Sequence, residues 1–320
     1  MNTALKLAGF GLGLLAVFGA ATGIGAAAGP VTEEPSAAER DMTSGTGPAE
    51  EGDAAHGDDA HGDDAHGDDA HGGPAAQAFT GLQVSEDGYT LALADRALPA
   101  GPATPVAFRV LAPDGHPVTD YTVSHDEDLH LIAVRRDLAG FQHVHPDLGP
   151  DGVWSVPLDL SPGTWRLFAD FTATADGENR TLGADLAVAG DYTPAPLPEP
   201  SRTTEVDGYT VTLDGDLLAG EEADLTLSVS RGGAPVTDLE PYLAAFGHLV
   251  ALRDGDLAYL HVHPAGEPGD GVTAPGPDIT FTTTAPSAGT YRLFLDFRHG
   301  GVVRTAAFTV VVDTHEEHGS

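Results

Sequence analysis

The sequence predicts an all-β protein, with two tandem immunoglobulin-like antiparallel β-sandwich domains that follow an N-terminal hydrophobic helix and a disordered linker. Three observations support this prediction. Short runs rich in Val, Leu, Phe, Thr and Tyr alternate with Gly, Pro and Asp turns. The chain contains 41 Gly and 24 Pro in 320 residues, which favours turns over long helices. A three-histidine pattern also recurs 118 positions later, which indicates a duplicated domain.

The N-terminal segment predicts export from the cytoplasm. Lys6 precedes an uncharged, apolar stretch over residues 7–28. This stretch is longer than the core of about 7 to 15 residues that a signal peptide needs, which favours an uncleaved membrane anchor. Ala26 and Ala28 also offer a small-residue cleavage site. With either alternative, the remainder is extracytoplasmic, anchored to the cell membrane by the helix or secreted.

Composition sets the predicted boundaries of the other parts. Large apolar residues are scarce between the apolar stretch and the first strand pattern, so this segment cannot bury enough surface to fold. A Pro-rich segment, DYTPAPLPEPSR, separates the two copies. The predicted parts are residues 1–30 (signal anchor or signal peptide), 31–80 (His/Asp-rich linker), 81–190 (first sandwich), 191–202 (connector), 203–313 (second sandwich) and 314–320 (tail).

A five-residue repeat, AHGDD, lies inside the predicted linker. It spaces histidines evenly, with pairs of aspartates between them. Imidazole and carboxylate groups together suit divalent ions such as Cu(II), Ni(II) and Zn(II). A solvated acidic spacer is the alternative, because low-complexity segments are commonly only solvated. The even spacing favours weak metal capture by His56, His61, His66 and His71.

Charge and cysteine content exclude several functions. The formal net charge of -35 repels nucleic acid and anionic lipid headgroups, so we expect no nucleic-acid partner. The absence of cysteine excludes disulfides, iron-sulfur clusters, thiolate zinc sites and cysteine nucleophiles. Divalent metal ions are the partners that the acidic composition favours, and the membrane is a partner only through an uncleaved N-terminal segment. A protein partner is not indicated.

A three-histidine pattern occurs once in each copy. The two segments read HLIAVRRDLAGFQHVHP and HLVALRDGDLAYLHVHP. In HVH the two imidazoles are two residues apart, so they point to the same face of an extended strand. Imidazoles that converge on one point are typical of transition-metal sites. The predicted metal ligands are His130, His143 and His145 in the first copy, and His248, His261 and His263 in the second.

A hairpin is expected to complete each cluster. In the second copy, RDGD predicts a two-residue turn, which pairs His248 with His261 across the hairpin. A two-residue turn at the corresponding place in the first copy would pair His130 with His143. Cross-strand partners have Cβ atoms about 4.5 to 5.5 Å apart, and the third histidine lies diagonally within reach. We therefore expect one three-histidine site in each domain.

A non-metal interpretation competes with this one, because the face that carries the histidines is also apolar. Buried histidines bonded to backbone carbonyls would show the same alternation. Three neutral imidazoles packed together, however, leave acceptor nitrogens in need of partners, which favours a shared ion. The apolar neighbours on this face are Ile132, Val134 and Phe141 in one copy, and Val250, Leu252 and Tyr259 in the other.

Charged residues near the clusters have a structural interpretation. Asp170 and Asp296 alternate with core residues in LFADF and LFLDF, so we expect them to face outward and to pair with Arg166 and Arg292. Residues 125–128 add ligand types near the first cluster only. If these residues take part in binding, the two sites are not equivalent.

The chain resembles a group of bacterial exported or membrane-anchored proteins that carry H-L-I-x-V-x-R-D-L-x-x-F-x-H-x-H-P followed by a G-T-W/Y-R-L-F-x-D-F strand. The resemblance covers both copies and implies β-sandwich modules related to heavy metals. A looser likeness joins HVH to the copper-ligand strand of copper-zinc superoxide dismutase. No histidine occurs between His145 and His248 to act as the bridging ligand and zinc cluster of that family, so the dismutase interpretation is disfavoured.

We therefore predict an extracytoplasmic protein that binds or buffers a divalent transition metal, copper first and zinc second, and that is not an enzyme. Imidazole sites bind Cu(II) more tightly than Zn(II), and the only methionines are Met1 and Met42, which argues against a Cu(I) carrier. The alternative is a cell-surface β-sandwich interaction or adhesion module with structural histidines. No nucleophile-base pair or phosphate loop indicates catalysis.

Overall fold

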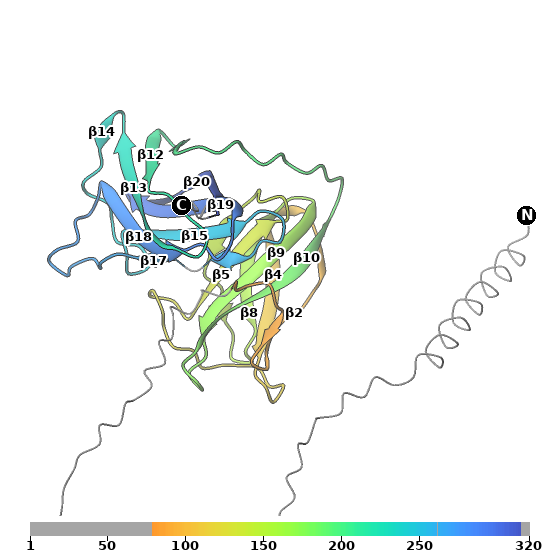
Figure 1. Ribbon diagram of the computed structural model, residues 1–320. Helices are drawn as coiled ribbons and strands as arrows, with labels where there is room; N and C mark the ends of the chain where they lie inside the picture. The colour runs from red at the N-terminus through yellow and green to blue at the C-terminus, as the bar shows by residue number, and fades with distance from the viewer. Residues whose placement is uncertain (1–78, 261, 315–320) are drawn as a thin grey trace, which may run out of the picture. The chain divides into compact units, whose positions relative to one another are not determined.

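The computed structural model describes residues 79–260 and 262–314, and these residues are all-β (Figure 1). They form twenty strands and no helix, so this part of the chain has no helix long and apolar enough to cross a membrane. The predicted N-terminal helix, the linker and the tail lie outside the described residues, as do His261 and the side chain of His263. Both sandwiches belong to one compact unit of the chain.

The first sandwich consists of two five-stranded sheets. One sheet has the order β1-β2-β4-β8-β7, and the other has the order β3-β10-β9-β5-β6. Only β3 and β10 pair in parallel, while the other neighbours are antiparallel. The strands are β1 (Ser85–Glu86), β2 (Tyr89–Leu93), β3 (Ala97–Pro99), β4 (Gly101–Leu111), β5 (Leu129–Arg135), β6 (Gln142–Val144), β7 (Asp147–Leu148), β8 (Trp154–Leu160), β9 (Gly163–Thr172) and β10 (Asn179–Ala189).

The second sandwich repeats this plan. One sheet has the order β11-β12-β13-β18-β17, with β14 also paired to β13, and the other has the order β16-β15-β19-β20. The strands are β11 (Thr203–Val206), β12 (Tyr209–Asp214), β13 (Glu222–Arg231), β14 (Ala234–Pro235), β15 (Gly247–Arg253), β16 (Tyr259–Leu260), β17 (His263–Pro264), β18 (Asp278–Thr284), β19 (Gly289–His299) and β20 (Val302–Val312).

The strand order is that of an immunoglobulin-like sandwich. In the first unit, β2-β4-β8 faces β10-β9-β5, which corresponds to the A-B-E and G-F-C arrangement of such folds. The strand β8, WSVPLDL, alternates between buried and exposed residues because one face covers the core and the other meets water. Each sandwich has its own core, which includes Trp154 and Trp165 in the first and Phe281 and Phe308 in the second.

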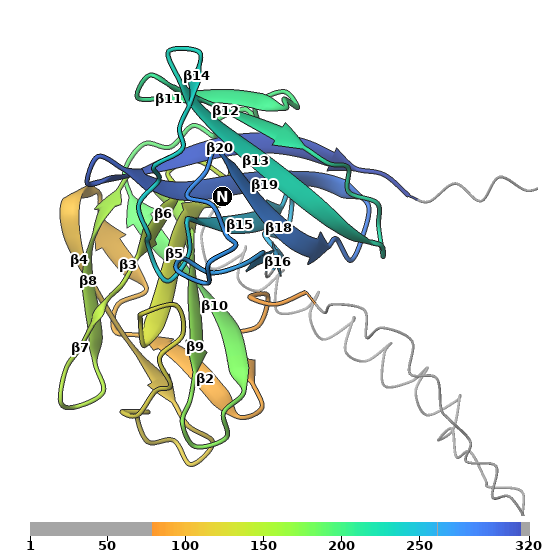
Figure 2. The same cartoon turned by 90° about the vertical axis from the view of Figure 1, so that its left-hand side faces the viewer.

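Two strands in each sandwich are buried on both faces. In β5, Leu131 and Ala133 point into the core of the first sandwich, while Ile132 and Val134 point to the opposite face. That opposite face packs on its counterpart in the second sandwich, so the apolar histidine-bearing faces form an interface between the sandwiches. Both views place β5 next to β15 (Figures 1 and 2). The buried members of the interface are Ile132, Val134, Leu138, Phe168, Val250, Leu252, Leu257, Tyr259 and Phe294.

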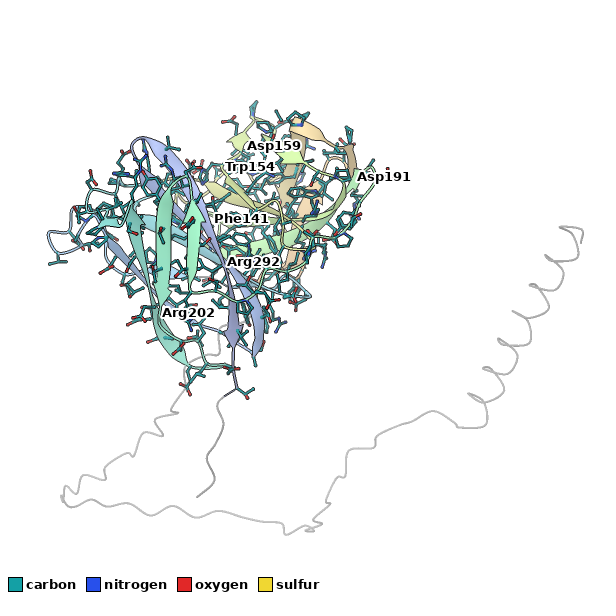
Figure 3. All side chains as sticks on the ribbon, turned by 90° about the horizontal axis from the view of Figure 1, so that it is seen from above. Phe141, Trp154, Asp159, Asp191, Arg202 and Arg292 are labelled. Carbon is teal, nitrogen blue, oxygen red and sulfur yellow. The ribbon has the colours of Figure 1, made fainter. Side chains whose placement is uncertain are left out.

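A stacked pair of aromatic rings contributes to this interface. The rings of Phe141 and Phe294 lie 4.0 Å apart between centroids and are nearly parallel, at 6°. Figure 3 shows Phe141 where the first sandwich meets the second. Thr80, which precedes the first strand, also exchanges backbone hydrogen bonds with Tyr259 of the second sandwich. The interface therefore combines apolar packing with main-chain pairing.

Truncation of the interface should destabilise the protein. Phe294 is 3% exposed, so Phe294→Ala should lower the free energy of unfolding by about 3 to 5 kcal/mol through lost burial and a residual cavity. Urea unfolding followed by tryptophan fluorescence measures this change. Val303→Ala on the neighbouring strand, at a side chain that is 39% exposed, should change it by less than about 0.5 kcal/mol. Equal effects of both substitutions would show that the interface contributes nothing.

Candidate metal centre

Three of the predicted ligands come together in the first sandwich. His130 lies on β5, His143 lies on β6, and His145 follows β6 directly. One nitrogen of each ring lies within 4.8 Å of the other two. The ring centroids are 5.4 Å apart for His130 and His143, and 5.0 Å apart for each pair with His145. Imidazoles bound to one ion through nitrogens at about 2.0 to 2.1 Å have centroids about 4.5 to 5.5 Å apart, so the cluster has the size of a metal site.

The predicted hairpin register in the first sandwich is wrong by two residues. His143 pairs with Ile132, not with His130. The loop is longer than two residues: the Arg135 N–H donates to the Ala139 carbonyl, and Leu138 adopts a left-handed φ of 61°. Because side chains alternate with a period of two, a shift by two residues keeps every histidine on the same face. The cluster therefore forms despite the wrong register.

Hydrogen bonds to two acceptors set the tautomers of His130 and His143. His130 Nε2 lies 3.0 Å from the Ser124 carbonyl oxygen, which can only accept, so Nε2 carries the hydrogen. His143 Nδ1 lies 2.8 Å from the Asp296 carboxylate and donates to it. In neutral rings the lone pairs are then on His130 Nδ1 and His143 Nε2. In metal sites, a carbonyl or carboxylate that accepts a hydrogen bond from the non-ligand nitrogen commonly orients the histidine.

The two lone-pair nitrogens face each other. His130 Nδ1 and His143 Nε2 are 3.2 Å apart. Two acceptors at this distance repel unless a cation lies between them, either a proton on one ring or a metal ion shared by both. Ligand nitrogens at about 2.0 to 2.1 Å from one ion are about 2.9 to 3.4 Å apart for bond angles between square and tetrahedral. The measured separation falls in this range.

His145 supplies a third buried nitrogen. Its Nε2 is buried and has no hydrogen-bond partner among the described residues, while its Nδ1 lies 3.8 Å from Glu127 Oε1. Burial, together with the neighbouring His143, His130 and His248, lowers the pKa of His145 to about 3. Burial also lowers the pKa of His130. Both rings are therefore neutral near pH 7, which is the form that binds metals.

Only His248 of the three ligands predicted in the second sandwich has a described side chain. The register is again wrong by two residues, since Leu252 pairs with Tyr259, and β16 ends at Leu260. His263 then pairs with Thr282 in the other sheet. A four-residue loop in place of the expected two-residue turn accounts for the shift, because the Arg253 N–H donates to the Ala258 carbonyl. His261 and the His263 side chain lie outside the described residues, so their part in metal binding stays a prediction.

His248 lies beside the first cluster, across the interface. Its ring centroid lies 6.2 Å from that of His143, 6.4 Å from that of His130 and 5.1 Å from that of His125. Its Nε2 donates to the Leu243 carbonyl at 2.7 Å. Burial lowers the pKa of His248 to about 3, although this hydrogen bond opposes the shift. A cavity of about 40 Å³ lies between His248, His130 and His143, large enough for a water molecule or an ion.

The prediction that Asp170 and Asp296 face outward is wrong. The Asp296 side chain is 4% exposed and bonds His143 across the interface, and Asp170 is buried beside Asn179. A signal for this burial was present in the sequence. The run RLFLDF is apolar at both alternating positions, which is typical of a strand buried on both faces. An aspartate on such a strand needs a buried partner.

The predicted tract ligands His56, His61, His66 and His71 lie outside the described residues. His125, which is not among the predicted ligands, lies beside His130 and His248. His125 occupies the turn between Ser124 and Glu127 with a left-handed φ of 50°. This turn supplies the carbonyl that orients His130 and the carboxylate beside His145.

Both sandwiches match one protein family, described as a domain of unknown function (DUF8832), over residues 83–190 and 204–314. These two ranges make up more than half of the chain. The chain belongs to this family. The double match confirms the duplicated domain, whereas the family description makes no statement about metals, so the predicted relation to heavy metals stays a prediction. No curated protein matches the chain.

Solved structures that are similar to the chain include adhesin and fibronectin(III)-like modules. The Escherichia coli adhesin FdeC is 18% identical, with 72% of this chain and 65% of that chain covered and a TM-score of 0.24. Yersinia pseudotuberculosis InvD is 11% identical, with 74% and 61% covered and a TM-score of 0.23. The chain thus spans less than two thirds of either protein. Fibronectin(III)-like modules of Clostridium thermocellum CbhA are 8% identical, with 72% and 98% covered and a TM-score of 0.19. Such low TM-scores carry no argument about function.

The buried histidines should make the metal-free protein sensitive to acid. The unfolded chain binds a proton at each histidine near the ordinary pKa of 6.5, whereas folded His145 and His248 bind one only near pH 3. Protonation therefore favours the unfolded state, and the free energy of unfolding should fall as the pH falls from about 6.5 toward about 3. Urea unfolding in the presence of a chelator measures the slope. His145→Gln should reduce this slope, whereas His116→Gln, at an exposed turn, should leave it unchanged.

Proposed function

We propose that the protein is an extracytoplasmic binding or buffering protein for a divalent transition metal, copper first and zinc second. The observation that carries the proposal is the pair of oriented nitrogens, His130 Nδ1 and His143 Nε2, at 3.2 Å. The unpartnered Nε2 of His145 provides the third donor. These residues would hold the ion, and Ser124 and Asp296 would orient the rings that bind it.

The donor set supports Cu(II) as the first candidate. Neutral imidazoles bind Cu(II) more tightly than Zn(II) at equal geometry. The chain has no cysteine and only two methionines, so it offers no soft thiolate site for Cu(I). The site lies between apolar sheet faces, and its partly desolvated nitrogens would bind an ion more tightly than a solvated His/Asp tract. We infer that the tract gathers ions and that the compact site retains one.

A cell-surface interaction or adhesion module is the second candidate function. His130 and His248 each donate to a backbone carbonyl, as structural histidines do. In this case the stability of the protein would not depend on metal ions, whereas an ion bound only by the folded state must raise the melting temperature.

Loss of the triad should abolish tight copper binding. In a full-length background with His56, His61, His66 and His71 replaced by alanine, calorimetric titration with Cu(II) should show one tight site. Adding His143→Ala and His145→Ala should weaken that site by about 100-fold or more, because two of three ligands are lost. The matched control, His116→Ala in an exposed turn, should bind as the background does. Equal binding by the triad variant and the control would refute the proposal.

Asp296 should act as a positioning residue for the ion. Asp296→Ala removes the acceptor that holds His143 Nδ1–H, and we expect Cu(II) affinity to fall by about 10- to 100-fold. Asp296→Asn keeps an acceptor oxygen and should restore most of the loss. The copper hyperfine splitting, measured by electron paramagnetic resonance, should change in the alanine variant and return toward the wild-type value in the asparagine variant. A merely structural role would lower stability in both variants without this spectroscopic difference.

A further inference from the structure

The interface brings a fourth imidazole beside the three-histidine cluster. His248 occupies in β15 the position that His130 occupies in β5, since the two are related by the 118-residue repeat. It lines the same cavity of about 40 Å³ as His130 and His143. Resting on the metal-binding function proposed above, we propose that His248 is the fourth ligand, so that one ion joins the two sandwiches.

The hydrogen bonding of His248 leaves the correct nitrogen free. Its Nε2 donates to the Leu243 carbonyl at 2.7 Å, so in the neutral ring the lone pair is on Nδ1. His130 has the same arrangement, with Nε2 bonded to the Ser124 carbonyl and Nδ1 facing the site. Corresponding turns supply the two carbonyls, since residues 124–127 and 242–245 each close with a pair of backbone hydrogen bonds. The two carbonyls occupy adjacent positions of these turns, because Ser124 corresponds to Tyr242 and not to Leu243, but both bonds hold Nε2 of the ring.

The distances require only a small movement. The centroid of His248 lies 6.2 Å from that of His143 and 6.4 Å from that of His130. The nitrogens that lie within 4.8 Å of one another belong to His130, His143 and His145 but not to His248. Neighbouring imidazoles on one ion have centroids about 4.5 to 5.5 Å apart, so His248 must approach His143 and His130 by about 1 Å. Displacements of this size are common at interfaces when a ligand binds. Glu127 is not the fourth ligand in this arrangement, because it faces Nδ1 of His145, on the side away from the unpartnered Nε2.

Polar contacts hold the second sandwich in place around this site. The Ala244 N–H donates to the Asp126 carboxylate at 2.9 Å, and Asp296 accepts from His143. Both bonds cross the interface beside His248. An ion bound by His248 and by the first triad would be bound only when the sandwiches are docked, so metal binding would stabilise the docked arrangement.

The number of imidazole ligands tests the proposal. The full-length background without the four tract histidines is loaded with one equivalent of Cu(II), and the bound imidazoles are counted by X-ray absorption and pulsed electron paramagnetic resonance. We expect four in the background and three in His248→Gln, with Cu(II) affinity reduced by about 10- to 100-fold. His299→Gln is the matched control in the same sandwich, because His299 bonds Tyr209 and Asp238 instead. It should keep four imidazoles.

The outcomes separate this proposal from the function on which it rests. Three imidazoles in the background, with tight binding that depends on His143 and His145, would overturn the role of His248 and leave the metal-binding function intact. No tight Cu(II) binding by the background would overturn both. If His248→Gln does not fold, the count in the background still decides, because a three-imidazole site refutes a fourth histidine ligand.

Discussion

The packing of the two histidine-bearing sheet faces against each other is the constraint on which the candidate site depends. In β5 the same face carries His130, Ile132 and Val134. If this face met water, the imidazoles would be hydrated and would have no reason to converge. Because the equivalent face of β15 covers it, the apolar neighbours exclude water and the rings must find partners among protein groups or ions. The stability of the interface and the chemistry of the site therefore have the same origin.

The burial of Asp296 by this packing favours a positive ion in the site. Its carboxylate is 4% exposed and accepts from His143 and from the Thr305 hydroxyl. A buried carboxylate is costly unless positive charge lies nearby, and burial makes His145 and His248 resist protonation. A bound dication would satisfy both requirements at once, since it neutralises the carboxylate and leaves the imidazoles in their neutral, ligand form.

Much of the fold could be predicted from the sequence, but the site only in part. Alternation of apolar residues and the 118-residue repeat predicted tandem sandwiches, because both depend on local patterns. The face shared by His130, His143 and His145 was also predictable, since the side-chain period survives a wrong register. Two features were not. Leu138 adopts a left-handed backbone conformation, which cannot be predicted from a leucine in the sequence. The position of Asp296 depends on how one sandwich packs on the other.

The two repeats contribute different residues to one composite site. Asp296 and Asp170 occupy matching positions in β19 and β9, yet Asp296 bonds His143 while Asp170 bonds Asn179. The turn beside His130 carries acidic residues, whereas the matching turn beside His248 has Leu243 and Ala244. One repeat thus supplies most of the donors, and the other supplies the cover, the carboxylate and one more imidazole. A single sandwich would leave the triad open to water, so the second copy is required by the site as well as by the interface.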